Sequence, residues 1–155
     1  ATGGSFLSME AALKVIGLLV LSVLLASSMN MLFVLFTNTL SAFSTLSTII
    51  GTLIGFLAGV YVPMGVLPTF AQNLIMLFPI SHSSLLLRDA FMAESIDKVF
   101  AGVPIEHIEA YKINFGIMYE MNGSNLDTST SLVVIIGSIL IFSIVSIIIF
   151  KKKNK

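Results

Sequence analysis

The sequence predicts an all-α integral membrane protein with three transmembrane helices and a re-entrant or extracellular helical hairpin. Composition supports this fold class: of the 155 residues, 56% are hydrophobic and only 10% are charged, whereas soluble domains carry about 25% charged residues. The order of the apolar runs supports it as well, because two of them are long enough to cross a bilayer and a third is interrupted by prolines and glycines.

The first transmembrane helix is expected over residues 13–36, after an N-terminal extracellular segment at 1–12. Asn30 is the one amide in this apolar run, and an amide in hydrocarbon is costly without a partner. Two interpretations stay open for Asn30: a hydrogen bond to a neighbouring helix, or a polar point on a substrate path. The hydroxyl-rich stretch at 37–47 is expected to form a cytoplasmic connection.

The second transmembrane helix is expected over residues 48–68, with small residues on one face. Gly51, Gly55 and Gly59 recur every four residues, so they line one side of a helix. In water each would weaken the helix by about 1 kcal/mol, whereas in a membrane small residues let a second backbone approach closely. We therefore expect these glycines to form a helix-packing contact, although the pattern does not identify the other helix.

A break is expected at Pro63, Gly65 and Pro68, because proline removes a backbone donor and clashes with the preceding turn. The apolar segment that follows ends at Pro79 and is too short to cross the hydrocarbon. Backbone groups freed at this depth need protein or a water-filled cavity as a partner. Residues 69–92 are therefore predicted to be re-entrant or extracellular helices, and these prolines with Gly65 are predicted to form the re-entrant turn or gate.

His82 and Arg88 are the candidate path or interface residues of this hairpin. The serines on both sides of His82 favour a structural or gating role for it. Arg88 has two interpretations. It ends a helix at the membrane interface, where it reaches water or pairs with Asp89, or it faces a cavity under the turn and contacts substrate or a partner acid.

Residues 93–128 are predicted to form an extracellular polar loop that contains an amphipathic helix. Charged residues alternate there with apolar residues that fall near one helical face; the apolar members are Ile105, Ile108, Phe115 and Met118. This helix would lie on the membrane or cap the other helices. The Asn122-Gly123-Ser124 run also matches a glycosylation acceptor, but its composition favours a turn.

The last transmembrane helix is predicted over residues 129–150 and is followed by a cytoplasmic basic tail at 151–155. Lysines occupy four of the five tail positions, out of eight basic residues in the chain. Under the positive-inside rule this cluster places the C-terminus in the cytoplasm of a multi-pass protein of the cell membrane. With three crossings, the loop at 93–128 is then extracellular.

Several kinds of chemistry are not expected from this sequence. It has no cysteine, which excludes disulfides and thiolate metal sites, and it has no phosphate-binding loop, HExxH or GxSxG pattern. Its formal net charge of zero predicts no nucleic-acid partner. We therefore expect neither an enzyme nor a metal site, since a hydrolase built on His82 and Ser83 would lack a third orienting group.

The run GFLAGVYVPMGVLPTFAQNLIMLFPISHSSLLLRD resembles the C-terminal half of a type-2 ABC exporter permease. In that family a small-residue helix precedes a G-x-x-x-P-x-x-x-L-P pattern, a later proline and a helix ending in arginine; the matching positions here are Gly59, Pro63, Leu67, Pro68, Pro79 and Arg88. The resemblance covers about residues 13–92 and 130–153. It implies that these helices are the fourth to sixth of a six-helix permease domain.

The resemblance also implies partners. The family works with a second permease domain, as a homodimer or heterodimer, and with separate ATP-binding cassette subunits that hold ATP and Mg²⁺, so no cofactor is expected in this chain. Membrane lipids would surround it. We expect the chain to be a fragment of a longer protein, because three further helices precede this half in the family. The alternative is a non-transporting membrane scaffold or sensor subunit whose 93–128 loop binds an extracellular ligand.

Overall fold

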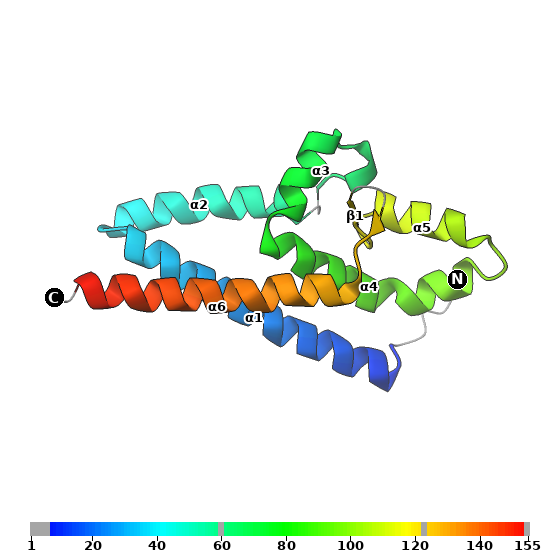
Figure 1. Cartoon of the computed structure of the whole chain (residues 1–155), viewed down its shortest axis with the longest axis horizontal. Coiled ribbons are helices and arrows are strands. Elements are labelled where there is room, and N and C mark those ends of the chain that lie inside the picture. The colour runs from blue at the N-terminus through cyan, green and yellow to red at the C-terminus, as the bar shows by residue number, and fades with distance from the viewer. Residues whose placement is uncertain (1–6, 59–60, 122–123, 154–155) are drawn as a thin grey trace.

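The protein is an elongated bundle of helices in which α1, α4 and α6 pack against one another (Figure 1). The computed structural model describes residues 7–58, 61–121 and 124–153. Its elements are α1 (Met9–Phe36), α2 (Leu40–Leu57), the short 3₁₀ turn η1 (Met64–Val66), α3 (Thr69–Met76), α4 (Pro79–Val99), α5 (Ile105–Asn114), β1 (Glu120–Met121), β2 (Ser124–Asn125) and α6 (Thr128–Lys153). The predicted helical class is therefore confirmed, with one two-residue antiparallel strand pair added to it.

The hydrophobic core lies where α4 meets α1 and α6. Leu25 of α1, Leu86 of α4 and Ile135 of α6 are each at most 2% exposed. The core continues outward to Met64 and Tyr119, so it also holds the turn before α3 and the segment before β1. The outer segments are thus packed on the bundle rather than tethered only by the chain.

Two helices are long and apolar enough to cross a membrane. They are α1, with 28 residues, and α6, with 26 residues, which at 1.5 Å per residue are each about 40 Å long. By the same measure a third candidate arises if α3 and α4, which meet at a 92° bend, are counted as one span, while α2 is apolar but shorter. The fold is therefore that of a membrane protein with two or three spanning segments by length and composition.

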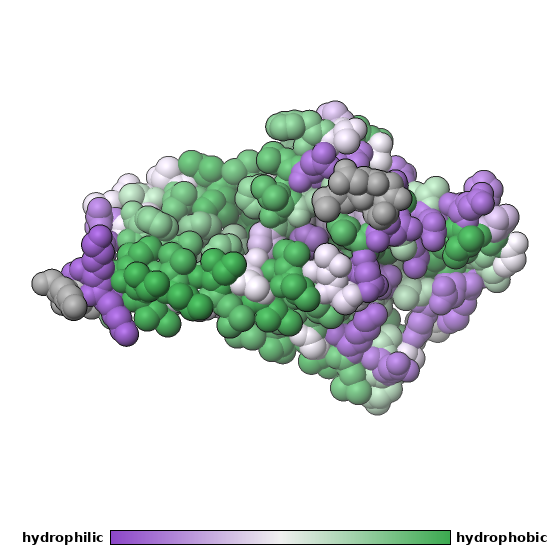
Figure 2. Space-filling view, in the orientation of Figure 1, coloured by the Kyte–Doolittle hydropathy of each residue, from purple (hydrophilic) through white to green (hydrophobic). Residues whose placement is uncertain are grey.

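Polar residues mark the two ends of the bundle. Figure 2 shows an apolar surface over α2 and much of α6, with hydrophilic residues beyond it at the end of α6 and around α4 and α5. At the first end, the Lys153 ammonium group donates to the Leu35 carbonyl and to Asn38 Oδ1, both at 3.0 Å. At the other end, the Ser8 N–H donates to Glu94 Oε1 at 3.3 Å.

The first helix begins four residues earlier than the predicted 13–36 span. Ser8 caps it, because its hydroxyl oxygen accepts a bond from the Ala11 N–H at 3.2 Å. It ends at Phe36 as predicted, where the Thr37 hydroxyl donates back to the Phe33 carbonyl at 3.2 Å. Residues 9–12, assigned from the sequence to an extracellular segment, are therefore helical.

The second helix departs from the prediction at both ends. The connection expected at 37–47 shortens to three residues, and the helix runs over Leu40–Leu57 rather than 48–68. Thr39 caps it, and hydroxyls inside it bond back by one turn, as Thr52 does to the Thr48 carbonyl at 3.0 Å. The hydroxyl-rich stretch, predicted as a connection, is therefore helical from Leu40 onward.

The four prolines start helices instead of breaking one. Pro63, Pro68 and Pro104 precede η1, α3 and α5, and Pro79 is the first residue of α4. Proline suits these positions because the first helical N–H groups have no intrahelical acceptor. The predicted proline break within a 48–68 helix is corrected accordingly: α2 ends before Pro63.

The predicted polar loop at 93–128 is largely structured. α4 continues through it to Val99, and α5 ends at Asn114, so Phe115 and Met118 do not share a helical face with Ile105 and Ile108 as the sequence predicted. Gly116, with φ +66°, turns the chain directly after α5. The turn predicted at Asn122 and Gly123 lies outside the described residues.

Helix α6 begins beside an acidic cap. Asp127 accepts bonds from the Thr128 N–H at 2.9 Å and from the Ser129 hydroxyl. The Ser129 hydroxyl, followed by the Thr128 N–H, lowers the pKa of the Asp127 carboxyl, as expected for groups that stabilise a carboxylate at a helix N-terminus. The helix continues through the predicted 129–150 span to Lys153.

Candidate functional site

The candidate site is the hairpin formed by α3 and α4. Three contacts give the register of α4 along α1: the Ser83 and Ser22 hydroxyls form a hydrogen bond, Asp89 lies 3.8 Å from the Lys14 ammonium group, and Glu94 accepts from the Ser8 N–H. The α4 residue number rises as the α1 number falls, so the two helices are antiparallel. Since Ser22 is close to the midpoint of α1, α4 starts near the middle of α1. It runs from there toward the outer end of the bundle, which is the end that contains Ser8.

Contacts with α6 place the same turn near the outer end of that helix. His82, in the first turn of α4, lies beside Ser131, in the first turn of α6. The lysines of α6 are at its opposite end. The bend between α3 and α4 therefore lies well short of the lysine-bearing end of the bundle.

His82 is a buried residue that connects three helices at the turn between α3 and α4. The residue is 3% exposed, and its ring has Nε2 2.9 Å from the Met76 carbonyl oxygen and Nδ1 3.0 Å from the Ser131 hydroxyl. A carbonyl only accepts, so Nε2 carries the proton and donates, and Nδ1 of the neutral ring accepts from the Ser131 hydroxyl. His82 thereby joins α3, α4 and α6. The Ser83 hydroxyl bonds to Ser22, so the Ser83–His82 pair of the hydrolase interpretation is not formed.

Tyr119 packs the segment before β1 against His82 and the start of α4. Its ring meets the His82 ring edge to face, with centroids 5.5 Å apart, and its hydroxyl donates to the Ser81 carbonyl at 3.1 Å. Burial raises the pKa of the Tyr119 phenol, so the hydroxyl keeps its proton and serves as a donor. Tyr119 thus fixes the segment before β1 to the start of α4.

Arg88 connects α4 to two distant stretches of backbone. One guanidinium nitrogen donates to the Ala58 carbonyl at 2.9 Å and another donates to the Phe115 carbonyl at 3.1 Å. The Ser84 hydroxyl donates to the same Ala58 carbonyl at 2.9 Å. Carbonyls at helix ends lack intrahelical donors, and a planar guanidinium can reach two acceptors at once. Arg88 therefore ties the ends of α2 and α5 to α4.

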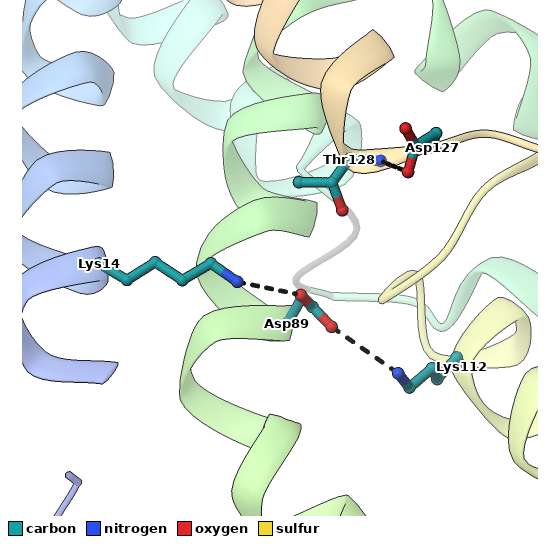
Figure 3. A network of polar contacts seen from close by, with 5 residues as sticks. All are labelled: Lys14, Asp89, Lys112, Asp127 and Thr128. Atoms are coloured by element: carbon teal, nitrogen blue, oxygen red, sulfur yellow. Dashed lines mark hydrogen bonds and ion pairs between the residues drawn. The ribbon is translucent and has the colours of Figure 1, made fainter. Parts of the chain in front are cut away.

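Asp89, which follows Arg88 in α4, forms ion pairs with two other helices. Figure 3 shows its carboxylate between Lys14 of α1 and Lys112 of α5, with ion-pair distances of 3.8 and 3.9 Å. Partly exposed pairs of this kind contribute about 0–1 kcal/mol each. The triad therefore orients α1, α4 and α5 at the outer end of the bundle more than it stabilises them.

The predicted glycine face does not form a contact between two helices of this chain. A Cβ atom added at Gly51 would meet no atom within 4 Å, and one added at Gly55 would overlap the Tyr61 ring; Gly59 lies outside the described residues. The chain is packed more closely at Gly65, because a Cβ there would overlap the Asn114 side chain and approach the Asn114 Cα to 3.1 Å. Gly65 thus lets η1 pack against the end of α5.

The structure brings some candidate residues together and separates others. His82 and Arg88 lie on one helix, with Pro79 at its start and Gly65 and Pro68 in the adjoining turn. Asn30 is exposed on α1 and is no part of this cluster. Helical spacing alone could have linked Arg88 to Ser84, one turn away, but Tyr119 and Ser131 are remote in sequence and carry no local signal.

Hollows border the hairpin on two sides near the turn between α3 and α4. A groove of about 280 Å³ lies between α1, α2 and α4, lined by Ser22, Ile54 and Leu87 among others. A cavity of about 350 Å³ lies on the outer side, between α3 and the segment from Ile113 to Glu120. Within the described ranges no group of three or more histidine, aspartate or glutamate side chains is arranged to hold a metal ion.

Comparison with known proteins adds no assignment. No protein-family model, no curated protein and no solved structure matches this chain.

Proposed function

We propose that this chain is the C-terminal half of the membrane-spanning permease domain of an ATP-driven exporter, and that it works with a separate ATP-binding subunit. The observation that carries the proposal is the course of α4, whose first turn lies opposite the middle of α1 and beside the first turn of α6. α4 starts opposite Ser22, near the middle of α1, and leads back outward to Glu94 beside Ser8. A re-entrant segment is the feature that the resemblance to exporter permeases implies, and here α3 meets the returning α4 at a bend of 92°.

A third crossing by α2 completes this arrangement. α2 starts next to Asn38, which accepts a bond from Lys153 at the lysine end, and it finishes at Ala58, whose carbonyl is held by Ser84 and Arg88. Its 18 residues are about 27 Å long, close to the roughly 30 Å hydrocarbon thickness. With α1, α2 and α6 crossing, the region from 93 to 128 lies on the same side as the start of α1.

The proposed topology has the lysine end in the cytoplasm and α5 outside the cell. Since the chain has no cysteine, Ser95→Cys and Lys153→Cys introduce unique labels at exposed positions. A membrane-impermeant maleimide should label Ser95→Cys in intact cells and Lys153→Cys only after the membrane is opened, as the positive-inside rule requires. Labelling of both positions from one side would contradict the re-entrant hairpin.

The groove between α1, α2 and α4 is the proposed part of the translocation path in this chain. It combines apolar walls with the hydroxyls of Ser22, Ser83 and Ser84, and no charged residue lines it. An apolar path with a few hydroxyl groups suits a lipophilic substrate.

The glycine side of α2 is the proposed contact with a second permease domain. None of the described side chains of α2 from Leu40 to Phe56 is buried, and the space beside Gly51 is open within this chain. A second helix could therefore approach closely at Gly51. Gly55 is less informative for a test, because a side chain there would also displace Tyr61.

Gly51→Leu should abolish compound-stimulated ATP hydrolysis while leaving membrane insertion intact, because the new side chain keeps the partner helix at a distance. The measurement uses the full-length protein co-purified with its ATP-binding subunit. Gly17→Leu is the matched control, since Gly17 is also an exposed helical glycine with no atom near an added Cβ. Equal activity of the two variants would exclude the α2 contact.

The outer cavity favours one second candidate function, a sensor subunit that binds an extracellular ligand. Its volume of about 350 Å³ falls within the size range of small-molecule sites. Co-purification separates the two candidates: an exporter brings an ATP-binding subunit with it, whereas a sensor does not.

A further inference from the structure

The outer cavity has two walls that are each anchored to the bundle. On the first wall, α3 is held at its end by the His82 bond to the Met76 carbonyl, and at its start by the Gln72 amide, which donates to the Leu67 carbonyl at 2.9 Å. On the second wall, Tyr119 is buried and bonded to Ser81. The space between them is therefore set by hydrogen bonds on both sides, which is the condition for a preformed site.

The position of Glu120 on the second wall is also fixed. Glu120 directly follows Tyr119 and pairs with Asn125 across the β1–β2 ladder. The Leu126 N–H donates to the Tyr119 carbonyl at 2.7 Å. Glu120 is an exposed residue that lines the cavity, so the cavity is open to solvent at Glu120, and the backbone is held on both sides of it.

The lining combines polarisable apolar groups with a single charge. Three methionines, Met64, Met76 and Met118, contribute to the walls, and Thr69, Asn73 and Glu120 contribute polar groups. Glu120 is the only charged residue of the lining. Among the residues that the structure describes, no hydrogen bond or ion pair occupies the side chains of Thr69, Asn73 or Glu120. Their bonding capacity is therefore available to a ligand.

We propose that this cavity binds a compact organic cation, with its ammonium group at Glu120 and its apolar body among the methionines. A carboxylate with no base in the lining favours a positive ligand, and thioether side chains adapt to varied apolar shapes. The Asn73 amide oxygen and the Thr69 hydroxyl supply further acceptors for an ammonium group. The cavity volume limits the ligand to a small one. The site goes beyond the proposed export function and does not depend on it.

Phenethylamine and 2-phenylethanol are the probes that test this site, because they share an apolar body and differ in charge at neutral pH. Calorimetric titration of the full-length protein in lipid nanodiscs, with empty nanodiscs subtracted, should show saturable binding of the amine. The amine should bind at least about tenfold more tightly than the alcohol, the effect of one charge-assisted hydrogen bond. Equal affinities, or no saturable binding of the amine, would overturn the proposal.

Glu120→Gln should remove that preference, lowering the affinity for phenethylamine by about tenfold while leaving 2-phenylethanol unchanged. Glu106→Gln is the matched control, because Glu106 is an exposed acid on α5 outside the lining. Asn73→Trp is a second variant that fills the cavity and should abolish binding of both probes. Unaltered binding in Glu120→Gln or in Asn73→Trp would place the ligand elsewhere and refute the site. Melting temperatures confirm that each variant is folded.

Discussion

Replacing Arg88 with methionine should lower the free energy of unfolding by about 2–3 kcal/mol. The change removes the bonds to the Ala58 and Phe115 carbonyls while keeping a long apolar side chain. A hydrogen bond to a charged group contributes about 1.5–3 kcal/mol, and less where water competes, as at Phe115. Thermal unfolding in detergent micelles measures the loss. Arg88→Lys should be intermediate, because one ammonium group cannot reach both carbonyls in the way a guanidinium does.

Lys98→Met is the matched control for Arg88→Met, since it removes an exposed positive charge near the end of the same helix. Its effect should stay within about 0.5 kcal/mol, as for most surface substitutions. If Arg88→Met were no more damaging than Lys98→Met, Arg88 would not hold the ends of α2 and α5 to α4. The first interpretation from the sequence, an arginine that merely reaches water at the interface, would then stand.

Replacing His82 with leucine should destabilise the protein by about 3 kcal/mol. Leucine has a similar volume, so the main loss is that the Met76 carbonyl and the Ser131 hydroxyl lose their partner. A buried polar group left unsatisfied costs about 1–3 kcal/mol, and the edge-to-face contact with Tyr119 adds about 0.5–1.5 kcal/mol. The loss is measured as a fall in melting temperature.

His107→Leu is the matched control, because His107 is exposed on α5. It shows whether the loss of stability comes from the buried position of His82 or from replacing any histidine by leucine. It should leave the melting temperature nearly unchanged. A second measurement is proteolysis of the outer region in folded protein, which should accelerate in His82→Leu because Tyr119 loses its contact there. Equal stability of the two leucine variants would show that the hydrogen bonds of His82 do not hold α3, α4 and α6 together.

The helical class and the two long apolar helices follow from local sequence. α6 matches its prediction because an uninterrupted apolar run of this length has no alternative that satisfies its backbone in lipid. The bounds of α2 were wrong because hydroxyl residues were interpreted as a connection. Serine and threonine occur in helices as well as in connections, and residues 40–47 are in fact helical. Composition alone does not distinguish these two cases.

By itself, the sequence determined that the chain is helical and apolar, that its apolar run is interrupted between Pro63 and Pro68, and that four of its lysines gather at one end. Only the tertiary structure decided what His82 and Arg88 do, since their partners Ser131, Ala58 and Phe115 lie 27–49 residues away. The physical reason is a difference in range. Apolar periodicity, proline geometry and helix capping act over one or two turns, whereas a buried polar group takes whichever partner the packing of distant helices brings to it.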